Sequence, residues 1–160
     1  EGLVVSDKSN SSDLLRWDMG VMFARSYVLQ LSDNVKRSNE QKLRNGKLVG
    51  PAGIGYLNVT KEDGTKDVVP DPERAHFIIK LFEYYIAGTS IGLLAKRLNK
   101  EGLRTKKGNP IAVSIVHKIL KNPFYYGVMR IKGKEYPHGY EPLISYHTFL
   151  KVQENYSRCI

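Results

Sequence analysis

The sequence predicts an α+β fold, in which a long N-terminal helix and a glycine-rich linker precede a mainly helical, helix-turn-helix-like domain with small β-hairpins. Three observations predict it. Residues 12–45 hold no proline and only one glycine, as a continuous helix requires. Glycines then gather at positions 46, 50, 53 and 55. After them, runs with helical apolar spacing alternate with short strand-like runs and turn residues.

The composition is that of a globular protein without a membrane span. The chain has 160 residues, of which 41% are hydrophobic and 26% charged. No run approaches the roughly 18 apolar residues that cross a bilayer, and the start lacks a signal-peptide pattern. The single cysteine, Cys159, excludes an internal disulfide framework and favours a reducing, cytoplasmic compartment. A start at Glu1 without an initiator Met, and an end at Ile160, favour a piece of a longer protein.

The long helix is predicted to have an oligomerising half and a basic end. Ser11 or Ser12 is expected to cap it and Gly46 to end it. Apolar residues at heptad positions form a coiled-coil seam: Leu14, Trp17, Val21, Ala24, Val28, Leu31 and Val35. A second apolar stripe lies beside the seam, so we expect self-association into a dimer or a larger assembly. Five bases at the far end are expected to face a polyanion: Lys36, Arg37, Lys42, Arg44 and Lys47.

The glycine-rich segment is predicted to be an extended, flexible linker that leads into a hairpin. Its glycines raise the possibility of a phosphate-binding loop, but no Gly-Lys-Ser/Thr follows and no helix begins there, which excludes a nucleotide site. Strands are expected at residues 55–59 and 66–69, joined by a turn over residues 62–65.

Four helices and a second hairpin are expected after the first hairpin. Asp71 and Pro72 open a helix that ends at Gly88, and Thr89 or Ser90 caps a shorter one that ends at Gly102. The next helix spans residues 111–120 and is stopped by Pro123. A hairpin turning at residues 132–134 follows, and Ser145 caps the last helix.

Positive charge is concentrated in one stretch of the sequence. The net charge of the chain is +9, and residues 96–134 hold eleven Lys or Arg against one acid, Glu101. Residues 62–83 are acidic instead, with six acids and three bases. A solvated surface is the plain reading of a basic run. With a single acid among twelve charges, we favour a face that binds nucleic acid.

The basic stretch has the order of a helix-turn-helix with a wing. Arg104, Lys106 and Lys107 lie in a nine-residue connection, longer than the usual tight turn, and are expected on phosphates. The following helix is predicted to bury Ile111, Ile115, Ile119 and Leu120. It is predicted to present Ser114, His117, Lys118 and Lys121 to base edges or backbone. The second hairpin carries Arg130, Lys132 and Lys134, as a wing does.

Other chemistry finds no support in the sequence. One cysteine makes no zinc site, and His76, His117, His138 and His147 are too scattered for a ligand set, so we expect neither metal nor cofactor. Stacking of aromatic residues on unpaired bases is an alternative for Tyr84, Tyr85, Phe124 and Tyr125. We expect these rings in the core instead, because they occupy helix and strand positions beside apolar neighbours.

An ordered series of motifs resembles the recombinase domain of large serine recombinases, the family of phage integrases and conjugative-element transposases. These motifs are "GPAGIGYLN", "VPDPERAHFIIKLFEYYIAGTSIGLLAKRLNKEGLRTKKGNP", "ILKNPFYYGVM" and "HGYEPLISYHTFLKVQ". The stretch "LLRWDMGVMFARSYVLQLSDNVKRSNEQKLRNGK" resembles the long helix that links catalytic and recombinase domains in that family. The resemblance covers nearly the whole chain.

The resemblance implies sequence-specific binding of double-stranded DNA at attachment half-sites. The parent enzyme would carry out site-specific integration or excision through a phosphoserine link, and its nucleophilic serine would lie in a separate N-terminal catalytic domain. No serine here has the expected arginine-rich surroundings, so no catalytic residue is carried over and this chain itself is expected to be inactive. The alternative function is an interaction and oligomerisation module that binds an acidic protein or a membrane surface.

On this interpretation the chain divides into a long linker and oligomerisation helix (1–46), a linker (47–58) and a recombinase DNA-binding domain (59–160). The candidate DNA-binding residues are Lys36, Arg37, Lys42, Arg44, Lys47, Arg97, Arg104, Lys106, Lys107, Asn109, Ser114, His117, Lys118, Lys121, Arg130, Lys132 and Lys134.

Overall fold

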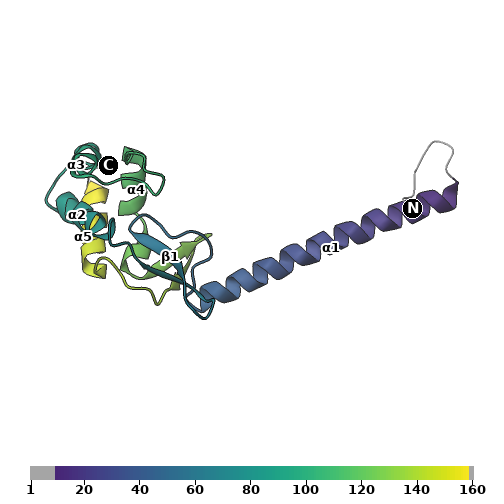
Figure 1. The fold of residues 1–160 in the computed structure, drawn as a ribbon. Helices are drawn as coiled ribbons and strands as arrows, with labels where there is room; N and C mark the ends of the chain where they lie inside the picture. The colour runs from purple at the N-terminus through teal and green to yellow at the C-terminus, as the bar shows by residue number, and fades with distance from the viewer. Residues whose placement is uncertain (1–9, 159–160) are drawn as a thin grey trace. The chain divides into compact units, whose positions relative to one another are not determined.

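The computed structural model describes residues 10–158 and confirms the predicted α+β fold. Its described part contains five α-helices, one short 3-10 helix and two two-stranded antiparallel sheets (Figure 1). The chain forms two compact units, which divide between Gln41 and Lys42. Cys159, the single cysteine on which the prediction of a reducing compartment rests, lies outside the described residues.

The first unit is almost entirely the helix α1, Ser11–Arg44, whose last three residues belong to the second unit. The capping residue is Asn10 and not the predicted Ser11 or Ser12, because the Asn10 side chain accepts the Asp13 N–H (2.9 Å). Gly46 ends the helix as predicted, with φ at +71°, and the Lys47 N–H turns back to the Lys42 carbonyl (2.9 Å). Lys36 pairs with Asp33 (3.2 Å).

After the end of α1, the second unit continues with the glycine-rich segment and a hairpin. Strand β1, Tyr56–Thr60, pairs with β2, Lys66–Pro70, so that Tyr56 faces Pro70 and Thr60 faces Lys66. The turn between them contains Asp63, whose carboxylate accepts the Thr65 N–H (2.9 Å). Both strands lie within one residue of their predicted bounds.

Four helices build the core of the second unit. They are α2 (Ala75–Ile86), α3 (Ile91–Glu101), α4 (Val113–Leu120) and α5 (Tyr146–Arg158). Helix α2 packs against α3 and α5, and α4 packs against the same two helices (Figure 1). Fully buried side chains come from all four: Ile78, Leu81, Phe82, Leu94, Leu98, Val116, Leu120 and Val152.

The 3-10 helix η1, Pro123–Tyr126, connects this core to the second hairpin. Strand β3, Val128–Ile131, pairs with β4, Lys134–Pro137, across a two-residue turn. Lys132 (φ +50°) and Gly133 (φ +79°) form that turn, as predicted. Ser145 caps α5 as predicted, because its hydroxyl accepts the Thr148 N–H (3.1 Å).

Two helices begin later than the sequence predicts. Helix α2 starts at Ala75 because residues 72–74 form a turn, in which the Asp71 carboxylate accepts the Glu73 N–H (3.0 Å). Helix α4 starts at Val113 and not at Ile111. Within it Val116 is buried, whereas Ile115, which was predicted in the core, is only half-buried.

Candidate nucleic-acid interface

The connection between α3 and α4 is a rigid miniature hairpin. Gly102 ends α3 with φ at +108°. The Thr105 N–H donates to the Asn109 carbonyl (2.8 Å), and Arg104 pairs with Pro110 in an isolated antiparallel bridge. The Asn99 side chain then holds the backbone of Ile111 at both polar groups, at 2.7 and 2.8 Å. These bonds order the connection, which spans residues 102–112 in the structure, and they hold α4 against α3.

Two of the three cations expected on phosphates have partners inside the protein. The Arg104 guanidinium donates through one nitrogen to the carbonyls of Asn99 and Leu103, both at 2.8 Å. The Lys106 ammonium donates to the Ala52 carbonyl (2.8 Å), and burial lowers its pKa. Lys107 is exposed at the tip of the miniature hairpin, and within the described part of the chain its side chain makes no such bond.

The outward face of α4 is smaller than the sequence predicts. Ser114 and Lys118 are exposed. The prediction that His117 points outward is wrong: it is half-buried, and its Nδ1 shares a hydrogen bond with the hydroxyl of Tyr156 (2.5 Å). Lys121 is exposed but lies over the Tyr156 ring, with its Nζ 4.3 Å from the centroid.

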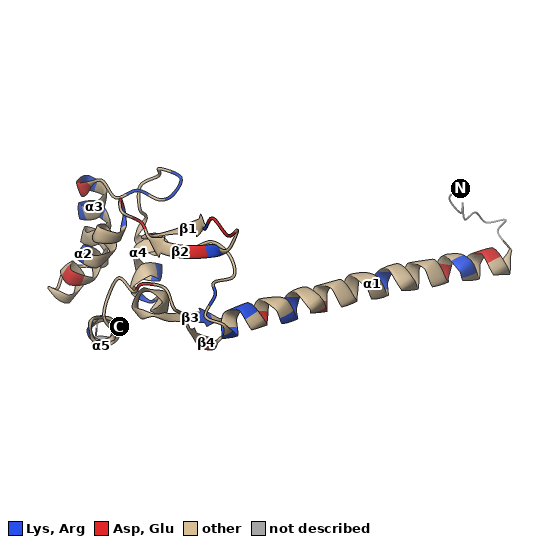
Figure 2. Ribbon diagram, turned by 60° about the horizontal axis from the view of Figure 1, so that its bottom comes forward, with Lys and Arg blue, Asp and Glu red and all other residues tan. Residues whose placement is uncertain are grey.

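The other predicted cations of the second unit also differ in what they touch. Arg97 stacks on the Tyr84 ring at 3.8 Å and pairs with Glu101 (3.1 Å). Arg130 pairs with Glu135 on the opposite strand (2.6 Å). The remaining side chains are exposed: Lys42, Arg44, Lys47, Asn109, Lys132 and Lys134. Figure 2 shows Lys and Arg along α3 and α4. In the first unit, Lys36 and Arg37 lie on α1.

An ion pair between a buried carboxylate and a half-buried guanidinium contacts the α3–α4 connection. Asp71, which is buried, pairs with Arg74 (2.6 Å), and Arg74 also donates to the Arg104 carbonyl (3.3 Å). Burial alone would raise the pKa of Asp71. The hydrogen bonds from Arg74 and from the Glu73 N–H outweigh burial and lower that pKa below its ordinary value.

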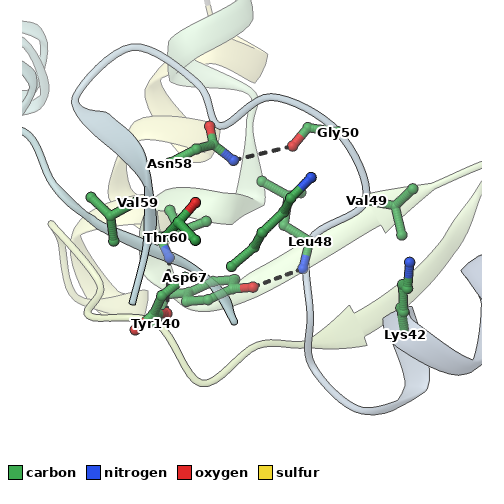
Figure 3. A pocket seen from close by; sticks show the side chains of 11 residues that line it. Lys42, Leu48, Val49, Gly50, Asn58, Val59, Thr60, Asp67 and Tyr140 are labelled. Atoms are coloured by element: carbon green, nitrogen blue, oxygen red, sulfur yellow. Dashed lines mark hydrogen bonds between the residues drawn. The ribbon is translucent and has the colours of Figure 1, made fainter. Parts of the chain in front are cut away.

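The glycine-rich segment is packed and is not the free linker that its composition predicts. A hollow of about 330 Å³ lies beside it, bounded by Lys42, Gly50, Asn58, Lys66 and Tyr140 (Figure 3). The Leu48 N–H donates to the Tyr140 hydroxyl (2.8 Å), and the Asn58 amide donates to the Gly50 carbonyl (3.3 Å).

Sequence reasoning missed the roles of Asn58 and Tyr140 at this segment. Asn58 lies in a predicted strand, which gives no sign that its side chain turns back to the residues before it. Tyr140 is 92 positions away from its partner Leu48, and no local pattern joins the two.

The aromatic residues that we assigned to the core are largely there. Tyr85, Phe124 and Tyr125 are buried, and Tyr84 is half-buried under Arg97. Within residues 10–158, no three His, Cys, Asp or Glu side chains are grouped to hold a metal ion. In the same range no helix has the length and apolar character needed to cross a bilayer.

Comparison with known proteins identifies one family. A family model described as Recombinase matches residues 72–158, more than half of the chain. No curated protein sequence matches significantly. The family match supports the resemblance to large serine recombinases that the sequence motifs indicate.

Two solved structures are similar in fold. One is a crystal structure of a complex of a large serine recombinase with DNA, with a TM-score of 0.63, 23% identity and 78% of this chain covered. The other concerns the sequence requirements of the Listeria innocua prophage attP site, with a TM-score of 0.64, 24% identity and the same coverage. This chain spans 38% and 52% of the lengths of those two chains.

Proposed function

The chain belongs to the recombinase family, and on this basis we propose that it is a DNA-recognition part of a large serine recombinase, binding double-stranded DNA at attachment half-sites. The single observation that carries the proposal is the α3–connection–α4 unit, whose bonded backbone presents Lys107 at its tip and Ser114 and Lys118 on the adjoining helix. Recognition of a DNA sequence requires that the contacting side chains be held by a rigid support of this kind.

The roles divide by chemistry. Lys107 is suited to a phosphate, because a lysine at a loop tip offers charge without fixed geometry. Ser114 and Lys118 are exposed on α4 and are suited to base edges. Lys132 and Lys134 extend the contact from the second hairpin. The parent protein would act on DNA in the cytoplasm through a phosphoserine link, with its catalytic serine elsewhere.

The basic end of α1 and the glycine-rich segment supply a second contact. We place Lys42, Arg44 and Lys47 against the backbone near the minor groove, with residues 48–56 following that groove. Lys36 and Arg37, which lie on α1 in the first unit, are proposed as further DNA-binding residues. The apolar first half of α1 would mediate self-association. Arg104, Lys106 and His117 take structural roles in this proposal.

The test separates phosphate contacts from base reading. The preferred duplex is first selected by the chain itself from a random library. Binding of Lys107→Met and of Ser114→Ala or Lys118→Met is then measured on the selected and on a scrambled duplex at two salt concentrations. We expect Lys107→Met to weaken both duplexes and to reduce the slope of log K against log salt by about 0.9. An α4 variant that loses a base contact should cost roughly 1–3 kcal/mol on the selected duplex and far less on the scrambled one.

Two results would contradict the proposal. If the selection enriches no sequence, the chain is an electrostatic interaction module, and acidic proteins and anionic vesicles become its candidate partners. If the α4 variants weaken both duplexes equally, α4 lies along the backbone and reads no bases.

A further inference from the structure

Four side chains of the second unit form hydrogen bonds with the backbone of residues 48–56, here called the strap: Asn58, Lys106, Tyr125 and Tyr140. We propose that Lys106 is a positioning residue that locks the strap to the α3–α4 connection, so that these two DNA-facing segments act as one rigid body. The coupling to DNA affinity rests on the function proposed above. The lock itself is a property of the protein alone.

The backbone of the strap is held group by group. The Leu48 N–H is bonded to the Tyr140 hydroxyl, and the Tyr125 hydroxyl donates to the Ile54 carbonyl, both at 2.8 Å. Asp71 adds a backbone bond, because its N–H donates to the Gly55 carbonyl (2.9 Å). The carbonyls of residues 50 and 52–55 and the N–H groups of Leu48, Ala52 and Tyr56 are all bonded, and these bonds restrict the freedom that a glycine-rich composition would otherwise give the segment.

Ala52 is the point at which the α3–α4 connection enters this arrangement. Its N–H donates to the Asn58 side chain (2.8 Å), and its carbonyl accepts the Lys106 ammonium (2.8 Å). Ala52 itself is buried, so its carbonyl needs a partner within the protein. Tyr125 follows α4 and Tyr140 follows β4, which leaves Lys106 as the side chain that brings the α3–α4 connection to the strap.

Lys106 is itself held in place by its surroundings. The miniature hairpin that carries it is closed by the bond from Thr105 to Asn109 and turns at Gly108, where φ is +82°. The buried carboxylate of Asp71 attracts the ammonium, while Arg74 repels it. Lys106 and Lys107 are both exposed, but the Lys106 ammonium is partly desolvated and bonded to a carbonyl, which makes it the poorer phosphate ligand. The two adjacent lysines therefore have different tasks.

The lock affects affinity through the population of the competent arrangement. A ligand that needs both segments in register binds with an apparent affinity reduced by the fraction of molecules in which they are in register. Loss of the lock should therefore weaken binding without removing a phosphate contact. Loss of a phosphate ligand should also lower the salt dependence.

The experiment compares three variants of the full chain: Lys106→Met, the matched neighbour Lys107→Met, and Lys106→Arg, which keeps a charged donor. Amide hydrogen exchange is measured in the free protein at Ala52 and at Tyr56, whose N–H donates to the Gly53 carbonyl. Binding to a random-sequence duplex is measured over a range of salt concentrations. Leu98 in α3, which is fully buried, serves as the internal reference for exchange.

We expect Lys106→Met to speed exchange at Ala52 about tenfold, as for one hydrogen bond from a charged group, and to leave Leu98 unchanged. Its affinity should fall at an unchanged salt slope, and Lys106→Arg should restore both quantities. Lys107→Met should leave exchange unchanged and reduce the slope by about 0.9.

Unchanged exchange at Ala52 in Lys106→Met overturns the proposal, and so does a slope reduced as in Lys107→Met, which would make Lys106 a phosphate ligand. If the wild-type chain binds no duplex, the proposed DNA function and the coupling to affinity both fail, while the exchange data still decide whether the lock exists.

Discussion

Lys106 and Lys107 are adjacent, exposed lysines, yet the Lys106 ammonium is bonded to the Ala52 carbonyl, whereas the structure describes no such bond for Lys107. A buried carbonyl needs a hydrogen-bond donor, and in the folded chain a nearby side chain supplies it. Arg104 and His117 were recruited in the same way, by carbonyls at the end of α3 and by the Tyr156 hydroxyl. A count of charges carries no such information, because the partners lie far away in the sequence.

His138 makes the stability of the second unit depend on pH. Its Nδ1 accepts the Tyr140 N–H (3.2 Å), so its Nε2 carries the proton and donates to the Phe124 carbonyl (2.8 Å). The neutral ring satisfies both bonds, and burial lowers its pKa below the ordinary 6.5. A lowered pKa in the folded state stabilises the fold above pH 6.5. That stability is lost as the pH falls below 6.5 towards the folded-state value.

The predicted outcome is a free energy of unfolding that falls between pH 7.5 and pH 5 by more in wild type than in His138→Gln. Gln keeps an amide donor for the Phe124 carbonyl but does not titrate in this range. Urea unfolding at each pH measures the effect, with His147→Gln as the control, since His147 is exposed on α5. A pH dependence that is the same in wild type and in His138→Gln would show that another group causes it.

At the scale of elements, local signals sufficed wherever the chain itself determines the structure. Glycine ends α1 and α3, the Lys132–Gly133 turn closes the second hairpin, and Ser145 caps α5. The predicted start of α4 was wrong because the Asn99 side chain bonds to the backbone of Ile111 and holds that residue outside the helix. The prediction of a flexible linker at the glycine-rich segment was wrong for the same reason, because the side chains that hold this segment come from distant positions in the sequence. Periodicity and turn residues predict elements, and tertiary hydrogen bonds then shift their ends.

Helix α1 leads to a prediction about assembly. Its apolar side chains stay exposed within the chain, with Met22 70% and Phe23 69% accessible and Val21 and Val28 about half or more. Burial of a valine contributes roughly 1.5–3 kcal/mol, so a heptad seam of this length favours a helix pair. We expect the full chain to associate in solution. The double variant Val21→Glu, Val28→Glu should weaken association at least about 100-fold.

Sedimentation over a range of concentrations measures this association. The matched control is Ser26→Glu with Gln30→Glu, which adds the same charge to the same helix outside the seam and should leave association intact. A wild-type monomer at high concentration, with the helix formed by circular dichroism, would contradict the prediction. Equal loss in both double variants would instead indicate general charge repulsion.

At the scale of the whole molecule, the segregation of charge along the sequence predicted a face that binds nucleic acid, and that prediction needed no structure. The net charge of residues 96–134 exceeds the net charge of the entire chain. The structure distributes these charges over α3, the α3–α4 connection, α4 and the second hairpin. The recombinase family match agrees with this inference. Which cations remain available for a polyanion was beyond sequence reasoning. Ion pairs such as Arg130 with Glu135 depend on strand register, and the Arg97–Tyr84 stack depends on how α2 meets α3.

The last prediction is that the chain binds DNA but forms no covalent bond to it. The serine hydroxyls whose hydrogen bonds the structure describes are those of Ser12, Ser145 and Ser157, and they bond to Asn10, Thr148 and the Gln153 carbonyl. None of these partners is a base or a cation that would activate a nucleophile. Binding itself should be steeply salt-dependent, with a slope near −4.5 if about five phosphates are neutralised.

Supercoiled and linear duplexes are incubated with the chain, first without and then with Mg²⁺, and the products are separated under denaturing conditions. We expect retarded complexes in native gels and only intact DNA after denaturation, in both metal conditions. The control is the Lys107→Met variant, which should retard DNA less and likewise leave it intact. A protein–DNA adduct that survives denaturation would place a nucleophile within these 160 residues. That result would overturn the proposal that the catalytic serine lies outside this chain.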